Sequence, residues 1–239
     1  MSVHKSIMSK IFSLIKNPFR IKRVLFRRLF SKKYSWKDKE ESDHFGYKDY
    51  KNYNSYKEHQ KQKLEDGIDT WIPDYDKKYR KQLHSNLLKF KQVSEGSVVL
   101  CLAARLGGEV RAFQDIGCFA VGIDLNPGPN NKYVLSGDFH DIQFENSTVD
   151  IVFSNSLDHA FNIEKLLSEV KRVLKKGGFF VVELPRGYSE DEQFGEYESF
   201  EWETIGDMKS LISNSGFDID NCFEINSPFI GRQIYFKKN

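Results

Sequence analysis

Cysteine and long apolar runs are the features that this sequence most clearly lacks. It has three cysteines in 239 residues, Cys101, Cys118 and Cys222, and no two of them have the C-x-x-C spacing. This odd number argues against a disulfide framework and against a structural zinc site, and it fits a reducing compartment. No run of about 18 apolar residues occurs, so we expect no membrane-spanning helix and a cytoplasmic location.

Acidic residues are absent from the first 37 positions, which carry 11 lysines and arginines. The rest of the chain has 25 basic residues against 34 acidic ones, so a basic arm precedes an acidic body. Apolar residues at helical spacing on both sides of Asn17-Pro18 predict two short amphipathic helices in the arm. An anionic membrane surface is the favoured partner. The alternatives are nucleic acid, a cleaved targeting segment, and a solvated or partner-bound arm.

The hydrophobic share of 39%, with 20 Phe and 11 Tyr, is enough for a core and excludes wholesale disorder. Four tyrosines lie three residues apart in the segment 38–75: Tyr47, Tyr50, Tyr53 and Tyr56. This spacing predicts one helix face, with the helix running on to Gly67. The segment either packs onto the rest of the chain or caps a pocket, with Tyr56, His59 or Gln60 reaching a ligand.

From residue 76 onward, short apolar runs alternate with helical patterns. Strands are expected at 98–102, 119–123, 133–135, 151–154, 179–183, 217–225 and 233–237, and helices at 76–90, 109–116, 163–174 and 207–215. The last two strands follow each other without a helix, so they should pair antiparallel at or near one edge. The predicted fold is α/β, a Rossmann-like, doubly wound, mostly parallel seven-stranded sheet with an antiparallel last strand and a helical N-terminal extension.

Residues directly after each strand carry the functional prediction, because ligands of doubly wound sheets bind at the carboxyl ends of the strands. The turn 103–108 (AARLGG) is made mostly of small residues and leads into a helix whose end favours a negative group such as a carboxylate. Asp124 follows the second strand, 23 positions after Cys101, near the spacing of acids that bind ribose hydroxyls. Asp138 and Phe139 follow the third and offer an acceptor and an aromatic face to an adenine.

These pieces resemble the class I S-adenosylmethionine-dependent methyltransferases over about residues 76–239. The matching stretches are 98–107, 121–124 (VGID), 137–139 (GDF), 149–155 and 166–182. The resemblance implies S-adenosylmethionine as cofactor. It implies these cofactor-binding residues: Asp124 for the ribose, Asp138 and Phe139 for the adenine, Ala103, Ala104, Arg105 and Gly107 for the methionine end, Asn155 beside the cofactor, and Leu125 without a stated part of the cofactor.

The first turn departs from the family's pattern, in which an acidic residue precedes three glycines at alternate positions. Here Cys101 replaces the acid, Ala103 and Arg105 replace two glycines, and Gly107 remains. Alanine still permits close approach, whereas the Arg105 side chain must point away from the cofactor or contact its carboxylate. Residues 101–110 are similar to a variant first motif of the family, Cys-Leu-Gly-Ala-Arg followed by Gly and Glu-Val.

The acceptor side is predicted from the residues after the fourth strand and from the segment 186–203. A hydroxyl nucleophile needs a base, and His159 is the candidate catalytic residue, with a structural or capping role as its alternative. Residues 186–203 hold seven acids and five aromatic residues. That composition suits a polyhydroxylated ligand and argues against nucleic acid at this rim, unless the segment is a solvated loop. No metal site is expected.

The sequence therefore predicts methyl transfer from S-adenosylmethionine to a small-molecule or lipid-linked acceptor, with a glycan sugar as one candidate. The predicted parts are a basic arm (1–37) that can hold the protein peripherally at a membrane, a cap segment (38–75), and a methyltransferase domain (76–239) with a lid insertion (186–203). The alternatives are a non-catalytic cofactor-binding module and an RNA methyltransferase.

Overall fold

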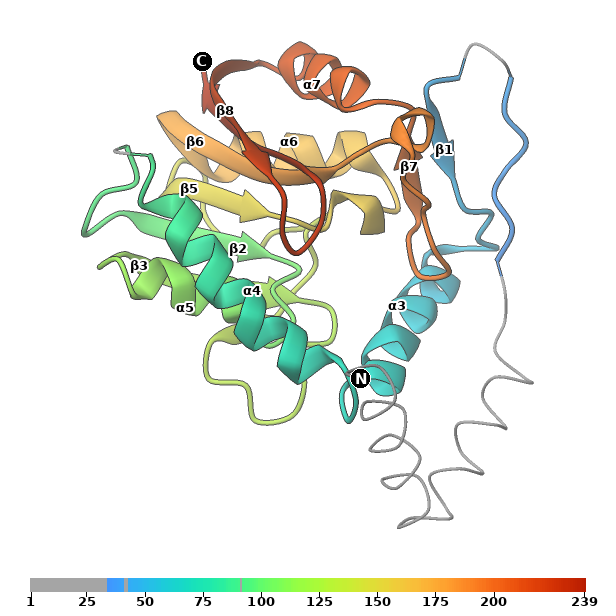
Figure 1. Cartoon of the computed structure of the whole chain (residues 1–239), viewed down its shortest axis with the longest axis horizontal. Helices are drawn as coiled ribbons and strands as arrows, with labels where there is room; N and C mark the ends of the chain where they lie inside the picture. The colour runs from blue at the N-terminus through green and yellow to red at the C-terminus, as the bar shows by residue number, and fades with distance from the viewer. Residues whose placement is uncertain (1–33, 41–42, 91) are drawn as a thin grey trace, which may run out of the picture. The chain divides into compact units, whose positions relative to one another are not determined.

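The seven-stranded sheet expected from the sequence is present. The computed structural model describes residues 34–40, 43–90 and 92–239, and within them this sheet has the strand order β4-β3-β2-β5-β6-β9-β8 (Figure 1). Strands β2 to β6 pair in parallel, and β9 is antiparallel to both of its neighbours, β6 and β8. The doubly wound, mostly parallel fold with an antiparallel last strand is thus confirmed. The strand order reverses between β2 and β5, which places the switch point after β2.

The elements have the following bounds. The strands are β1 (Phe45–Tyr47), β2 (Val98–Leu102), β3 (Phe119–Asp124), β4 (Val134–Ser136), β5 (Val149–Ser154), β6 (Leu174–Pro185), β7 (Phe200–Trp202), β8 (Phe217–Ile225) and β9 (Gly231–Lys238). The α-helices are α3 (Tyr53–Gly67), α4 (Ile72–Leu87), α5 (Gly108–Gln114), α6 (Ile163–Val173) and α7 (Ile205–Asn214), with short 3-10 helices η1 (Leu157–His159) and η2 (Tyr188–Glu190).

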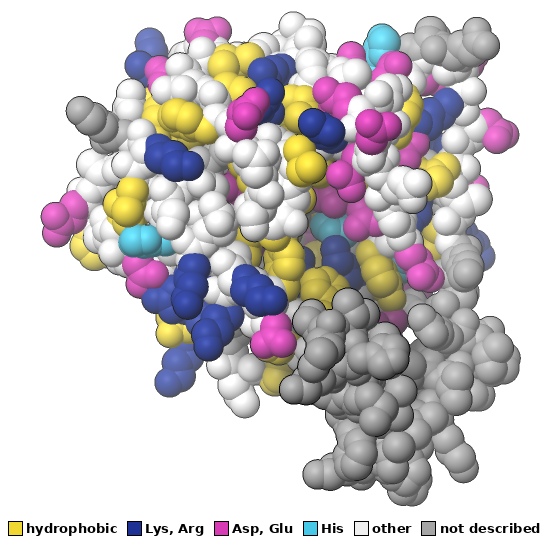
Figure 2. All heavy atoms as spheres, viewed as in Figure 1, with side chains coloured by type: hydrophobic (Ala, Val, Ile, Leu, Met, Phe, Trp, Pro, Cys, Tyr) yellow, Lys and Arg dark blue, Asp and Glu magenta, His cyan; other side chains and the backbone are white. Residues whose placement is uncertain are grey.

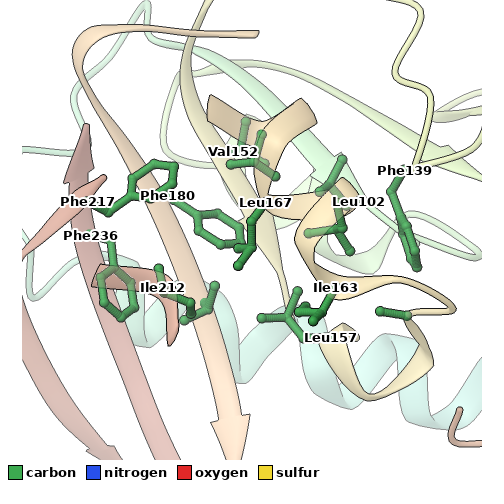
Figure 3. Packing of buried hydrophobic residues seen from close by; sticks show 14 of the residues in the cluster. Leu102, Phe139, Val152, Leu157, Ile163, Leu167, Phe180, Ile212, Phe217 and Phe236 are labelled. Atoms are coloured by element: carbon green, nitrogen blue, oxygen red, sulfur yellow. The ribbon is translucent and has the colours of Figure 1, made fainter. Parts of the chain in front are cut away.

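Two apolar clusters hold helices against the two faces of the sheet. On β2, Leu100 and Leu102 belong to the cluster with α6 and α7, whereas Val99 and Cys101 belong to the cluster with α4 and α5. Because a strand's side chains alternate between faces, a strand covered on both sides reads as a continuous apolar run, and this explains VVLCL. Figure 3 shows part of the first cluster, where strand residues such as Phe180 meet the helices.

The prediction that four tyrosines share one helix face is wrong for the first two, Tyr47 and Tyr50, which precede the helix. Residues 45–47 form β1, which pairs antiparallel with β7, so Tyr47 lies on a strand. Helix α3 begins after Asn52, whose side chain accepts a hydrogen bond from the Ser55 backbone N–H at 3.0 Å. This cap satisfies an amide that would otherwise lack a partner and sets the helix start. Of the four tyrosines, Tyr53 and Tyr56 are helical.

The segment 186–203 is not only a solvated loop, because its last part is the strand β7. Phe200 and Trp202 of β7 are fully buried, and Phe200 stacks on Phe45 of β1 with ring centroids 5.6 Å apart. Lys48, just after β1, donates a hydrogen bond to the Gly195 carbonyl oxygen at 3.0 Å. The insertion is therefore tied to the segment before α3.

The predicted amphipathic helices of the basic arm lie outside the described residues. Among the residues that the structure describes, no helix is long and apolar enough to cross a membrane.

Candidate functional site

A pocket opens at the carboxyl ends of β2 and β3. Three parts of the chain line it. The strand-end loops provide Ala103, Arg105, Asp124, Leu125, Asn126, Gly137 and Phe139, the segment after β5 provides Ser156 and His159, and α3 provides Tyr56, Gln60, Lys63 and Leu64. Six predicted site residues are thus brought together. Four others do not line the pocket: Ala104, Gly107, Asp138 and Asn155.

The turn after β2 follows the course of a glycine-rich loop although it carries side chains. Ala103 and Arg105 have φ values of 52° and 45°, in the left-handed region that glycine adopts most easily. Gly107 has φ 83°, and a Cβ there would lie 2.8 Å from Cβ of Tyr133, so this position requires glycine. Ala104 is fully buried in the core below the turn. The Arg105 guanidinium lies 5.6 Å from the centre of the Trp71 ring.

Asp124 holds this turn in place from the end of β3. Its carboxylate accepts hydrogen bonds from the backbone N–H groups of Arg105 (2.9 Å) and Asn126 (2.6 Å). Burial raises the pKa of Asp124, and the two amides act in the opposite direction. Because a carboxylate has about four lone-pair sites, Asp124 can still accept hydrogen bonds from the hydroxyls of a bound ribose.

The amino-terminal end of α5 is occupied by the protein itself. The Gly108 backbone N–H donates to Asp76 of α4 at 2.8 Å, and Arg111 forms an ion pair with the same carboxylate. Asp76 therefore already provides a negative group at this helix end, where a ligand carboxylate is expected from the sequence.

Asp138 is engaged by the cap segment. It accepts hydrogen bonds from the Tyr53 hydroxyl, from the His140 backbone N–H at 2.9 Å and from Nδ1 of His140 at 3.0 Å. Nε2 of His140 accepts from the backbone N–H groups of Phe161 and Asn162, both at 3.2 Å, so the imidazole proton is on Nδ1. Asp138 thus fastens α3 to the loop after β4.

His159 lies in the pocket with its tautomer fixed. Its Nδ1 donates to the Tyr197 carbonyl oxygen at 3.0 Å, which leaves the lone pair on Nε2, and Nε2 contacts Nζ of Lys63. Burial and then the charges of Lys63 and Arg105 lower the pKa of His159, so the imidazole is neutral. Burial, followed by the charge of Arg105, lowers the pKa of Lys63 to about 8. At pH 7 Lys63 is therefore mostly protonated, and the neutral imidazole of His159 carries the lone pair.

Two carboxylates accompany this pair. Asp158 lies 3.8 Å from Nε2 of His159, and burial followed by the nearby Glu198 raises the pKa of Asp158 to about 7. Ligand atoms of Asp158, His159 and Glu198 lie within 4.8 Å of one another, an arrangement that could hold a metal ion. Lys63 faces the imidazole nitrogen that a metal would need, so in this arrangement the lysine supplies the positive charge.

Helix α3 contributes four pocket residues; the sequence predicts two of them, Tyr56 and Gln60, as cap residues that reach a ligand and does not single out the other two. Tyr56, Gln60, Lys63 and Leu64 are spaced i, i+4, i+7 and i+8, which is one helix face. Tyr56 donates to the His159 carbonyl oxygen and Gln60 to that of Tyr197, both at 3.0 Å. His59, the other predicted cap residue, is buried against Tyr50 and does not line the pocket. The helical spacing of these four residues is the sequence signal that could have predicted Lys63 as a site residue.

The sheet order and the position of the pocket define the class of Rossmann-like domains that bind a nucleotide cofactor at the switch point. Residues 100–182 match the family model described as a methyltransferase domain. This match supports the predicted resemblance to the class I S-adenosylmethionine-dependent methyltransferases, with S-adenosylmethionine as the cofactor.

Curated relatives match over part of their length. The chain is 28% identical to a sterol 4-C-methyltransferase of Caenorhabditis elegans over 43% of this chain and 35% of that protein. It is 33% identical to a sarcosine/dimethylglycine N-methyltransferase of Aphanothece halophytica over 41% of each. The chain therefore spans about two fifths or less of the length of these two relatives.

Solved structures share the fold over most of the chain. The 1,6-didemethyltoxoflavin-N1-methyltransferase of Burkholderia thailandensis, solved with S-adenosylhomocysteine, gives a TM-score of 0.61 at 14% identity, covering 84% of this chain and 98% of that one. A SAM-dependent methyltransferase of Aquifex aeolicus gives 0.56 at 18% identity, covering 70% and 97%. At these identities the similarity concerns the fold.

Proposed function

We propose that this protein transfers the methyl group of S-adenosylmethionine to a hydroxyl of a small-molecule or lipid-linked acceptor. The observation that carries the proposal is the composition of the pocket, which joins the strand-end residues of a methyltransferase fold to the contacting pair His159 and Lys63. In this proposal Asp124 and Leu125 hold the ribose, Phe139 faces the adenine, and the turn 103–107 and Asn155 hold the methionine end. Residues 38–75 form a cap and residues 186–203 a lid on the domain 76–239.

S-adenosylmethionine supplies an electrophilic methyl carbon when bound. The residues named above would hold it, and its sulfur would keep the electron pair of the carbon–sulfur bond that breaks as the acceptor oxygen bonds to the methyl carbon. The acceptor proton passes to the imidazole of His159, which is neutral because its pKa is lowered by burial. Tyr56, Leu64 and Phe139 exclude water from the same space. Most of the rate acceleration comes from alignment of the two reactants.

The acceptor class follows from the lid. Figure 2 shows acidic side chains gathered around the insertion and β1, while Lys and Arg side chains gather over α4 and α5. An acidic rim with aromatic side chains favours a neutral polyhydroxylated compound such as a glycan sugar and disfavours RNA. The basic arm would place the protein at an anionic membrane surface in the cytoplasm, where a lipid-linked acceptor lies. Co-sedimentation with anionic vesicles and with RNA, with and without residues 1–33, separates these partners.

Isothermal titration tests the donor half of the proposal. Asp124→Ala should weaken S-adenosylmethionine binding by about 1–3 kcal/mol, since it leaves buried amides and ribose hydroxyls without their acceptor. The matched control is Asp141→Ala, at an exposed acid outside the pocket, which should bind as the unaltered protein does. Equal affinity in the Asp124 variant would contradict the assignment.

Radiolabelled methyl transfer tests the acceptor half. With tritiated S-adenosylmethionine and small-molecule and lipid extracts of cells lacking the protein, we expect label in the extract. Lys63→Met and His159→Phe should bind S-adenosylhomocysteine normally and lose transfer. Binding without transfer by the unaltered protein would favour the alternative of a non-catalytic cofactor-binding module.

A further inference from the structure

Glu109, in the first turn of α5, is a buried carboxyl group without a structural partner for one of its oxygens. The residue is 8% exposed, and its Oε2 has no hydrogen-bond partner among the residues that the structure describes. Its Oε1 lies 3.4 Å from Nδ2 of Asn155, a long and therefore weak hydrogen bond. A buried polar atom left in this way costs free energy of folding, so stability alone does not account for Glu109.

Glu109 adjoins the pocket although it does not line it. Asn155, which touches Glu109, accepts a hydrogen bond at 2.9 Å from the hydroxyl of Ser156, and Ser156 does line the pocket. The charged groups that act on Glu109 are Arg105 from the turn after β2, Asp76 from α4 and Asp124 from the end of β3. Three other titratable groups that it influences are Tyr75 and Tyr79 of α4 and Cys101 of β2. Among the charged residues that act on Glu109, Arg105 is the cation, and it also lines the pocket.

The methionine end of the donor is a zwitterion with an ammonium group that needs hydrogen-bond acceptors. Asp76 is already occupied by Gly108 and Arg111, and Asp124, which two backbone amides hold in place, is assigned to the ribose in the proposed function. Cys101 stands where the family has an acid, and burial raises the pKa of its thiol well above the ordinary value, so it supplies no negative charge. Glu109 is the remaining carboxyl group at this turn.

We propose, resting on the proposed function, that Glu109 binds the α-ammonium group of S-adenosylmethionine while Arg105 binds its α-carboxylate. Ligand binding then replaces the weak Asn155 contact with a charge-assisted hydrogen bond. The acid absent from the end of β2 is in this way supplied from α5.

Proton linkage gives the proposal a measurable signature. Burial raises the pKa of Glu109 to about 8, so in the ligand-free protein the group is mostly protonated at pH 7. An ammonium ion bound against it favours the carboxylate and lowers this pKa. Binding of S-adenosylhomocysteine at pH 7 should therefore release close to one proton. 5′-Methylthioadenosine, which lacks the amino-acid end, should release none.

The experiment is calorimetric titration of both ligands into the full-length protein at pH 7, in phosphate and in Tris buffer, whose different ionisation enthalpies report the protons released. In Glu109→Gln we expect S-adenosylhomocysteine affinity to fall at least tenfold and its proton release to disappear, with 5′-methylthioadenosine affinity unchanged. Unchanged binding of the latter also shows that the variant is folded. Arg105→Met should weaken S-adenosylhomocysteine but keep the proton release.

The inference is overturned if Glu109→Gln binds S-adenosylhomocysteine as tightly as the unaltered protein, or if the variant releases the same number of protons. Should Glu109→Gln fail to fold, Glu109→Met, which removes the polar group at similar volume, gives the same comparison. If neither ligand binds to the unaltered protein, the proposed function itself is refuted. If both ligands bind but Glu109→Gln does not weaken S-adenosylhomocysteine, only the inference about Glu109 is refuted.

Discussion

Replacement of Asp138 by asparagine should lower the free energy of unfolding by about 2 kcal/mol at neutral pH and by almost nothing near pH 2. Burial acts to raise the pKa of Asp138, but hydrogen bonds from His140 and Tyr53 outweigh it and lower the pKa from 3.8 to about 2. One pKa unit corresponds to about 1.4 kcal/mol, which gives the magnitude. The side chain is 22% exposed, so solvent screening is modest.

The sign follows from linkage. A carboxyl group whose pKa is lower in the folded than in the unfolded state stabilises the fold fully above the unfolded value, near pH 4. That stabilisation is lost as the pH falls through about 2, the folded value of Asp138. The asparagine variant cannot ionise, so the difference between the two proteins should shrink as the pH falls. Tyr53→Phe, which removes one donor, should cost about 1 kcal/mol at pH 7.

Urea denaturation followed by tryptophan fluorescence, repeated between pH 7 and the lowest pH at which both proteins fold, measures this difference. The control is Asp141→Asn, at an exposed residue three positions further on. Its free energy of unfolding should equal that of the unaltered protein at every pH. A difference between the Asp138 variant and the unaltered protein that stays constant with pH would refute the ionic account, and no difference at pH 7 would refute the role of Asp138 in fastening α3.

Two other predictions concern stability. Gly107→Ala should cost more than Gly96→Ala in thermal unfolding, because both have φ near 83° but a Cβ meets Tyr133 at 2.8 Å only at position 107, while position 96 has nothing within 4 Å; equal shifts would contradict the steric argument. Trp202→Ala should cost about 3–5 kcal/mol, the usual value for a buried tryptophan, since Trp202 is fully buried and donates to the Pro185 carbonyl oxygen at 3.3 Å. A loss below about 1 kcal/mol, by denaturant titration, would show that β7 does not stabilise the domain.

The central sheet could be predicted because its strands are covered on both faces and so appear in the sequence as apolar runs. Strand β8 matches its predicted bounds, 217–225. Helix α7 starts two residues earlier than expected, because Thr204 and Asp207 form a reciprocal cap. The pairing of β1 with β7 could not be predicted, since three-residue strands carry no periodic signal and their partner lies about 150 residues away.

Site residues at the ends of strands could be predicted, because the strand order decides where they lie. The contacts between segments that are distant in the sequence could not. Arg105 and Asp124 follow strands that lie side by side, so their placement depends on local sequence. Asp138 also follows a strand, yet its carboxylate is engaged by Tyr53, which the sequence places 85 residues away. Lys63 had the appearance of a solvated helix residue, and only the packing of α3 over His159 gives it a neighbour.

The face of α3 that lines the pocket has a consequence for acceptor selection under the proposed function. Its four side chains precede residues 100–182, the stretch that matches the methyltransferase domain model, so under the proposed function part of the acceptor side of the pocket is encoded outside that stretch, while Ser156 and His159 lie within it. Exchange of α3 between proteins of this fold would then be expected to redirect the methyl group to a new recipient while the affinity for the donor stays the same.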